Sequence, residues 1–172
     1  MSRQALFAID NDGAIHEKKK CTACSLWAGD WLHTNCMDGL GKPGATLFFV
    51  GQAPGKEDDN NGQPMTGYNG RLFRDYLNKA RIRTEEVYIT NALKCCLFEK
   101  EPTTTMFNAC KDHLQRELEH IKPKAIVVVG AKALLWLTGF SGVSKARRRS
   151  LPCVLDPKIP VYSIPIPLHL AT

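Results

Sequence analysis

Four short apolar segments recur along the chain between positions 46 and 166. They cover residues 46–50, 87–91, 125–129 and 161–166, and each is rich in β-branched or aromatic side chains. Continuous apolar runs of this length are typical of parallel strands that are buried on both faces. None of them approaches the roughly 18–20 apolar residues that a membrane-spanning helix needs. The pattern therefore predicts a buried parallel sheet and no membrane span.

Helical spacing fills the intervals between these strands. After Gly70, the apolar positions at helical spacing are Leu72, Tyr76, Leu77 and Ala80. A second stripe, ended by Pro123, consists of Phe107, Leu114, Leu118 and Ile121. Each stripe predicts a helix that packs on the sheet, and residues 131–137 predict a third, short helix. The alternation predicts an α/β fold of three layers around a central parallel four-stranded sheet, with right-handed crossovers.

Length and composition are those of one globular domain. The chain has 172 residues, of which 44% are hydrophobic and 23% are charged, and this length fits a single domain. We expect the domain to span residues 21–172, after a polar lead-in at residues 1–20 that shows no secretory signal. We expect a cytoplasmic protein and a monomer. The net charge of +6 is consistent with a polyanionic partner, although charge alone does not identify one.

Seven cysteines are the strongest chemical signal in the chain. In a reducing compartment they argue against a disulfide framework and in favour of metal ligation. Cys21 and Cys24 have the CxxC spacing that lets two thiolates reach one metal, and Cys110 follows Cys95 or its neighbour Cys96 through a loop. Four thiolates suit either a [4Fe–4S] cluster or a structural zinc ion. The cysteines outside this pattern, which we expect to be free thiols, are Cys36 and Cys153.

A glycine-rich turn follows the first predicted strand. Its sequence, GQAPGKEDDNNGQPMTGYNG, matches neither GxGxxG nor the GxxxxGK[ST] phosphate loop. It stands at the carboxyl end of a strand, where α/β sheets bind their ligands. We therefore expect the turn to line a ligand site, and the helix after it to offer free N–H groups to a phosphate.

Several motifs along the chain occur in a fixed order. GQAPGKEDDNNGQPMTGYNGRLF fits, without a gap, the pattern GEAPG, an acidic pair and GxPFVGxAGxLL, and VYITNALKC fits VYxTNxxKC. Cys110, IKPKAIVVVG and KIPV correspond to a spaced cysteine, IxPKxIVxLG and GIPV. Through these motifs the sequence resembles the iron–sulfur (family 4) uracil-DNA glycosylases and the related domains of some phage DNA polymerases. The resemblance covers residues 21–170.

The resemblance implies a monofunctional DNA glycosylase with a uracil-DNA-glycosylase-like fold. Such an enzyme flips a nucleotide out of the stack and cleaves its N-glycosidic bond, which releases uracil or another altered base and leaves an abasic site. We interpret it as monofunctional because no lysine stands in a pocket motif to form a Schiff base. The implied catalytic residues are Gln52, Asn91 and His169. The implied base pocket consists of Ala53, Pro54, Gly55 and Met65. The implied ligands of a [4Fe–4S] cluster are Cys21, Cys24, Cys95 and Cys110.

DNA is the partner that the resemblance implies. The residues expected to contact its backbone are Thr66, Gly67, Gly70, Lys145, Arg147, Arg148 and Arg149. The chain departs from the family where Met65 replaces a pocket phenylalanine, and where His169 reaches the family's histidine position only after a shift of three residues. Two further hypotheses follow. The chain is a catalytically weak or inactive DNA-binding module associated with replication, or it is an enzyme for a bulkier modified base, which the flexible methionine would accommodate.

Overall fold

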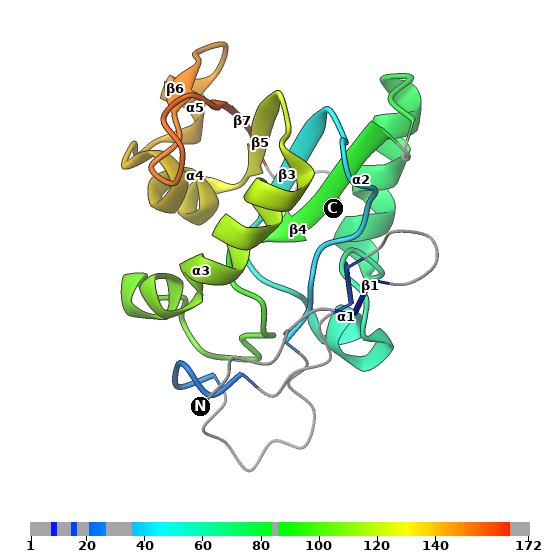
Figure 1. Cartoon of the computed structure of the whole chain (residues 1–172), viewed down its shortest axis with the longest axis vertical. Helices are drawn as coiled ribbons and strands as arrows, with labels where there is room; N and C mark the ends of the chain where they lie inside the picture. Colours follow the sequence, from blue (N-terminus) through cyan, green and yellow to red (C-terminus); the bar gives the residue numbers. More distant parts are fainter. Residues whose placement is uncertain (1–7, 10–14, 17–20, 27–35, 84–85, 166–172) are drawn as a thin grey trace.

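The computed structural model describes residues 8–9, 15–16, 21–26, 36–83 and 86–165. Its centre is a five-stranded sheet of order β4-β3-β5-β7-β6 (Figure 1). The parallel strands are β3 Leu47–Gly51, β4 Val87–Asn91, β5 Ala125–Val129 and β7 Pro160–Ile164. All four predicted strands are therefore confirmed, and their ends move by only one or two residues.

A fifth strand extends the sheet beyond the prediction. β6, Leu151–Pro152, pairs antiparallel with β7 at the edge of the sheet. A strand of two residues is too short to show a hydrophobic period, so the sequence does not predict β6. Its Pro152 fits an edge strand, because proline lacks an N–H donor for a second neighbour. The central sheet is thus mainly parallel, with one short antiparallel strand.

Helices cover the sheet on both faces, which gives the predicted three layers (Figure 1). On one face, α3 (Thr104–Ile121) and α4 (Ala131–Thr138) share a buried apolar core with Phe48, Tyr88 and Ile126. On the other face, α2 (Tyr68–Lys79) packs against Phe49 and Ile89. Because alternate residues of each strand point to opposite faces, the continuous apolar runs supply both cores.

The long helix α3 confirms its predicted stripe. Its buried residues include Phe107, Leu114, Leu118 and Ile121. The helix begins where the Thr103 hydroxyl accepts a hydrogen bond from the Met106 N–H at 3.2 Å, which satisfies one of the unpaired donors of the first turn. It ends at Lys122, whose backbone is left-handed with φ 53°, immediately before Pro123.

The buried face of α2 differs from the predicted one. Gly70, Phe73 and Leu77 are buried, whereas Tyr76 of the predicted stripe is 37% exposed. A Cβ at Gly70 would collide with the carbonyl group of Met65. A glycine is therefore part of the packed face, and a count of apolar side chains alone misses it.

The remaining elements are short and come from polar stretches. They are α1 Lys56–Asn61, α5 Val143–Ala146, and the antiparallel pair β1 Ala8–Ile9 and β2 Ile15–His16. The pair β1–β2 lies in the segment that we expected to be a polar lead-in, residues 1–20. Within the described residues, no helix combines the length and the apolar character that crossing a membrane requires.

Candidate active site and metal centre

A cavity of about 1070 Å³ lies on the α2 face of the sheet. It begins at the carboxyl ends of β3 and β4 and continues along α2. The predicted site residues that line it are Gln52, Ala53, Gly55, Met65, Gly67, Gly70 and Asn91. Pro54 and Thr66 do not line it. His169 lies outside the described residues. Seven of the residues chosen from the sequence thus meet at one cavity, at the sheet edge where the fold predicts a ligand site.

Asn91 is held beside the glycine-rich turn by the pairing of β3 with β4. Gly51 is the partner of Asn91 in the parallel register, and the N–H groups of Ala92 and Leu93 donate to the carbonyl oxygens of Gly51 and Gln52 at 2.9 and 3.0 Å. A Cβ at Gly51 would collide with the Asn91 side-chain oxygen. The absence of a side chain at Gly51 therefore makes room for the Asn91 amide, which is itself 5% exposed.

Asp58 holds the two arms of the turn together. One of its carboxylate oxygens, Oδ2, accepts a hydrogen bond from the Gly55 N–H at 2.9 Å. The other, Oδ1, accepts from the Thr66 N–H at 2.6 Å, the Thr66 hydroxyl at 3.0 Å and the Gly67 N–H at 3.1 Å. We call this set of Asp58, Gly55, Thr66 and Gly67 the Asp58 clamp. Asp58, the first residue of the acidic pair in this motif, therefore has a structural role in the turn.

The Asp58 clamp changes the interpretation of the following helix. We expected the N–H groups of Thr66, Gly67 and Gly70 to offer a phosphate site. The first two already donate to Asp58. Gly70 is buried, and it allows α2 to approach Met65. Within the structure, Thr66 and Gly67 therefore fix the turn through Asp58, and Gly70 allows the close approach of α2 to Met65.

Met65 occupies a special position in the pocket wall. Its backbone is left-handed, with φ 62°, a conformation that is uncommon for a residue with a side chain. Its methyl group lies 3.5 Å from the position that a Cβ on Gly51 would take. The side chain therefore borders the space next to Asn91, where the related family has an aromatic ring.

Lys56 also lines the cavity. Lys56 ends the sequence GQAPGK, so the expectation that the pocket motifs contain no lysine is wrong. Its ammonium group lies 4.0 Å from Glu99, and both side chains are exposed. Lys56 thus belongs to the solvated rim of the cavity.

A buried ion pair supports the strand end from the other face of the sheet. The Lys94 ammonium lies 2.6 Å from the Glu117 carboxylate, and their side chains are 0% and 1% exposed. The same ammonium donates to the Thr90 hydroxyl at 2.5 Å, and the other Glu117 oxygen accepts from the Gly39 N–H at 2.8 Å. This network ties the strand residue just before Asn91 to helix α3.

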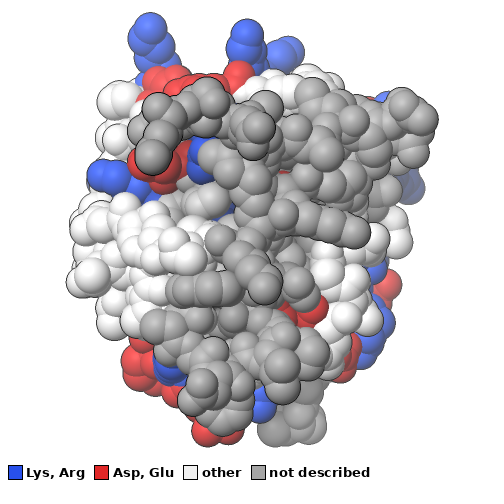
Figure 2. All heavy atoms as spheres, turned by 60° about the horizontal axis from the view of Figure 1, so that its bottom comes forward, with Lys and Arg blue, Asp and Glu red and all other residues white. Residues whose placement is uncertain are grey.

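The predicted basic block lies apart from the cavity. Lys145 belongs to α5, whose residues Val143 and Ala146 pack into the core on the α3–α4 face of the sheet, whereas the cavity lies on the α2 face (Figure 1). Arg147, Arg148 and Arg149 are exposed, and the Arg149 guanidinium lies 5.5 Å from the ring centre of Phe140. On the face that Figure 2 shows, the described Lys and Arg side chains are scattered along the rim among Asp and Glu.

The four predicted cysteine ligands belong to or border the apolar core that packs against α3. Cys95 and Cys110 are buried, and Cys21 and Cys24 pack against the same apolar core. The Lys94 N–H points to the Cys110 sulfur at 3.3 Å. Burial is the main cause that raises the pKa of Cys110 to about 12; Lys94 acts in the opposite direction, and the nearby Cys36 and Cys21 add smaller raising effects. Of the predicted ligands, Cys21 is thus close enough to Cys110 to act on it electrostatically, and Cys24 and Cys95 border or belong to the same core.

Cys95 and its neighbour Cys96 have different environments. Cys95 belongs to the core that contains Cys110, whereas Cys96 lies outside this core and its sulfur accepts a contact from the Phe98 N–H at 3.4 Å. Burial raises the pKa of Cys96, and the charges that act on it include Asp59, Lys56 and Asp58 of α1. The structure therefore favours Cys95 as the member of the pair that faces the other cysteines.

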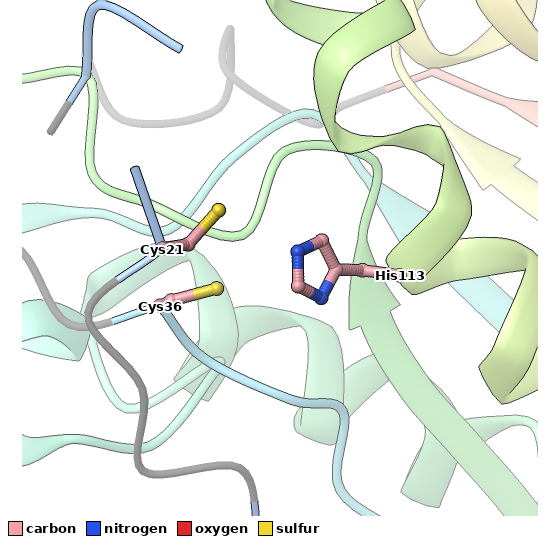
Figure 3. A group of neighbouring side chains, drawn as sticks. All are labelled: Cys21, Cys36 and His113. Atoms are coloured by element: carbon pink, nitrogen blue, oxygen red, sulfur yellow. The ribbon is translucent and has the colours of Figure 1, made fainter. Parts of the chain in front are cut away.

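Cys36 does not lie apart from the cysteine pattern, as we expected it to. Its sulfur, the Cys21 sulfur and a ring nitrogen of His113 all lie within 4.8 Å of one another (Figure 3). His113 was missed in the sequence, although it follows Cys110 by one helical turn on α3, a spacing that places both on one face. Cys153 is buried elsewhere, near Leu155 and Asp156.

Comparison with known proteins identifies the family. Residues 39–169 match the profile of the Uracil DNA glycosylase superfamily. The chain belongs to this superfamily. It is 38% identical over 135 residues to the type-4 uracil-DNA glycosylase of Thermotoga maritima, a match that covers 78% of this chain and 69% of that protein. It is also 38% identical over 120 residues to the type-4 uracil-DNA glycosylase of Archaeoglobus fulgidus, across 69% of this chain and 59% of that protein.

A phage DNA polymerase is a more distant relative of the chain. The DNA polymerase of Bacillus phage SP01 is 29% identical over 113 residues, which are 64% of this chain and 12% of the polymerase. Both resemblances that the motifs indicated, to type-4 uracil-DNA glycosylases and to a phage DNA polymerase, are thus confirmed. The match to the Archaeoglobus protein leaves about two-fifths of that relative uncovered.

Proposed function

We propose that this protein is a monofunctional DNA glycosylase that excises uracil, or another altered base, from DNA. The observation that carries the proposal is the meeting of Asn91 with the backbone of Gln52 and Ala53 at one cavity. An asparagine amide offers both a donor and an acceptor. It can therefore pair with a carbonyl oxygen and a ring N–H of a pyrimidine at the same time.

The proposed reaction replaces the bond between base and sugar with a bond between water and sugar. The N-glycosidic bond breaks, its electron pair leaves with the base, and the sugar becomes oxocarbenium-like. Water adds to this sugar carbon and the base takes up a proton, which yields the free base and an abasic site. Donors that are fixed before the reaction stabilise the anion as it forms, and we assign this task to the Asn91 amide, with the backbone of Gln52 and Ala53 lining the pocket. His169 remains the third proposed catalytic residue.

The lysine on the rim of the cavity provides a test of the monofunctional assignment. A lyase would form a Schiff base between a lysine and the abasic sugar. Lys56 is exposed, and its ammonium group lies 4.0 Å from the Glu99 carboxylate at the rim of the cavity. We expect sodium borohydride to trap no covalent complex with abasic DNA. A trapped complex that disappears in Lys56→Ala would contradict the assignment.

DNA is the proposed partner, and Lys145 with the three arginines that follow it is the proposed backbone contact outside the pocket. Phosphate contacts release counterions, so binding should weaken as salt rises. Replacing Arg147 and Arg148 with Gln should reduce the slope of this dependence without changing the excision rate of bound substrate. Arg149 is a less suitable target because it also packs on Phe140.

We propose that Cys21, Cys24, Cys95 and Cys110 hold a [4Fe–4S] cluster, with structural zinc as the alternative. The donor set fits, because two of the thiols are buried, two pack against the same core, and the Lys94 N–H is directed at the Cys110 sulfur. A cluster here would supply a rigid link between loops, and we assign it no electron transfer. A broad visible absorption in fresh protein distinguishes it from colourless zinc.

The decisive experiment is an excision assay on single- and double-stranded oligonucleotides that contain uracil. Asn91→Ala should abolish most of the release of uracil, whereas Asn108→Ala, an exposed asparagine on α3, should not. A panel of modified bases belongs in the same assay, since Met65 borders the pocket. If the protein binds DNA in a salt-dependent manner but releases no base from any substrate, the protein is an inactive DNA-binding module and the enzyme proposal fails.

A further inference from the structure

We propose that Cys21, Cys36 and His113 form a site for a single tetrahedral metal ion of the zinc type, distinct in composition from the four-cysteine set. The three donor atoms lie within 4.8 Å of one another (Figure 3). The Cys36 side chain is 5% exposed, and Cys21 and His113 are half-buried. Two thiols and an imidazole are the donors that zinc uses in its mixed structural sites.

The separation of the donor atoms indicates one ion. With zinc–sulfur and zinc–nitrogen bonds of about 2.3 and 2.0 Å, tetrahedral ligands stand about 3.5–3.8 Å apart. The atoms of this group need to move by about 1 Å or less to meet around one ion. A four-iron cluster places a separate iron atom behind each thiolate, so its ligands stand farther apart than this group allows.

Two of the three donors stand on anchored backbone. Cys36 precedes Met37, whose N–H donates to the Lys94 carbonyl oxygen at 2.8 Å. His113 precedes Leu114, which is 0% exposed in the core under α3. Cys21 packs against the same core. The group is therefore built by three separate segments, two of which are anchored by the fold.

Cys110 is the candidate for the fourth ligand. It lies one turn before His113 on α3, and residues three apart on a helix are neighbours on its surface. It is close enough to Cys21 and Cys36 for their charges to act on it. The set would then be three cysteines and one histidine, a composition that is common in structural zinc sites.

The Nε2 atom of His113 is the one that would bind the metal, but in the metal-free protein it carries a proton. Its Nε2 faces the two sulfurs in Figure 3, and its Nδ1 lies 3.2 Å from the Arg116 guanidinium. Arginine only donates, so a neutral His113 carries its proton on Nε2. An ion that binds at Nε2 moves this proton to Nδ1, which breaks the contact with Arg116, and releases the ligating thiol protons to solvent. Arg116→Gln, whose amide oxygen can accept from Nδ1–H, should therefore strengthen binding.

The site shares Cys21 with the four-cysteine set, and Cys110 too if it is the fourth ligand. One thiolate cannot serve both centres in their complete form. The chain would thus hold either the cluster or a single ion, and protein that lacks the cluster would take up zinc. This inference concerns metal binding and does not depend on glycosylase activity.

The test is a titration of the reduced, metal-free full chain with Co²⁺, a spectroscopic substitute for Zn²⁺. We expect one Co²⁺ per chain, with the visible bands of a tetrahedral site, thiolate charge-transfer absorption in the near ultraviolet, and displacement by Zn²⁺. His113→Ala and Cys36→Ser should each weaken binding by more than about tenfold. The matched control Cys153→Ser should bind Co²⁺ as the wild type does, and Cys24→Ser, which changes only the four-cysteine set, should retain Co²⁺ binding and so distinguish the two ligand sets.

The outcomes separate the two ligand sets. If Cys24→Ser abolishes Co²⁺ binding while His113→Ala and Cys36→Ser leave it unchanged, the ion uses the four-cysteine set and the proposal fails. His113 is half-buried on the side of α3, so its alanine variant provides the answer even if Cys36→Ser does not fold. In protein that carries the cluster, His113→Ala should leave the visible iron–sulfur absorption in place.

Discussion

The buried pair Lys94–Glu117 allows a quantitative prediction about stability. Lys94→Met removes the ammonium. The Glu117 carboxylate, which is 1% exposed, then keeps its hydrogen bond from the Gly39 N–H but has lost its oppositely charged partner. Leaving one member of a buried pair uncompensated costs about 3–5 kcal/mol. For a chain of this size 1 kcal/mol corresponds to about 2–4 °C, so the melting temperature should fall by about 6–20 °C.

The double variant Lys94→Met/Glu117→Leu isolates the reason for this loss. It removes both charges and fills the space with apolar atoms, a replacement that is often neutral or stabilising. We expect it to be more stable than Lys94→Met alone. Chemical denaturation followed by circular dichroism measures the free energies of unfolding of the wild type, Lys94→Met, Glu117→Leu and the double variant, and the metal content is determined in parallel because Lys94 adjoins Cys95.

Two results would refute the reasoning. One is a Lys94→Met variant within about 1 kcal/mol of the wild type, which would mean that water reaches the pair. The other is a double variant whose loss equals or exceeds the sum of the two single losses. Interacting residues deviate from additivity, so additive losses would show that the two side chains act independently.

Three further predictions concern the pocket and the core. Gly51→Ala should lower the single-turnover excision rate at least about tenfold because the new methyl group displaces the Asn91 amide, whereas Gly55→Ala, where the nearest atom is 3.7 Å away, should be tolerated. Asp58→Ala should lower the free energy of unfolding by about 2–4 kcal/mol, as measured in urea, by removing the acceptor of buried N–H groups; an unchanged value would contradict the Asp58 clamp. Burial, and then the Glu117 charge, raise the pKa of Tyr88 above its ordinary value. The contribution of Tyr88 to stability is therefore fully present below about pH 10 and falls by about 1.4 kcal/mol per pH unit above it, so urea melts at rising pH should find a slope that is smaller by this amount in Tyr88→Phe.

The parts of the fold that the sequence predicted are those that local periodicity determines. Strand β5 and helix α3 follow from continuous apolar residues and from a helical stripe, and both are confirmed. The buried face of α2 was predicted only in part: Leu77 is buried as expected, whereas Phe73 was omitted and Gly70 packs through its lack of a side chain. The short strand β6 has too few residues to form a pattern.

The same distinction holds for the candidate site: contiguous motifs could be predicted, whereas contacts between distant segments could not. Asn91 and the turn after β3 were found because their motif is contiguous and its position at the end of a strand has a physical meaning. The nearness of Cys21, Cys36 and His113 arises only when loops and α3 meet in space. Their sequence separation hides this contact, and only the Cys110–His113 spacing on one helix was available as a local signal.

The Asp58 clamp has a consequence for the thermodynamics of base binding. Because one carboxylate fixes both arms of the turn within the protein itself, the loss of backbone entropy in this loop accompanies folding rather than ligand capture. Preorganisation of this kind raises affinity by reducing the cost of ordering on binding. The turn would therefore already have its bound conformation when a flipped base enters the pocket. Weakening the clamp should then appear calorimetrically as a more unfavourable entropy of binding, even where every pocket contact is retained.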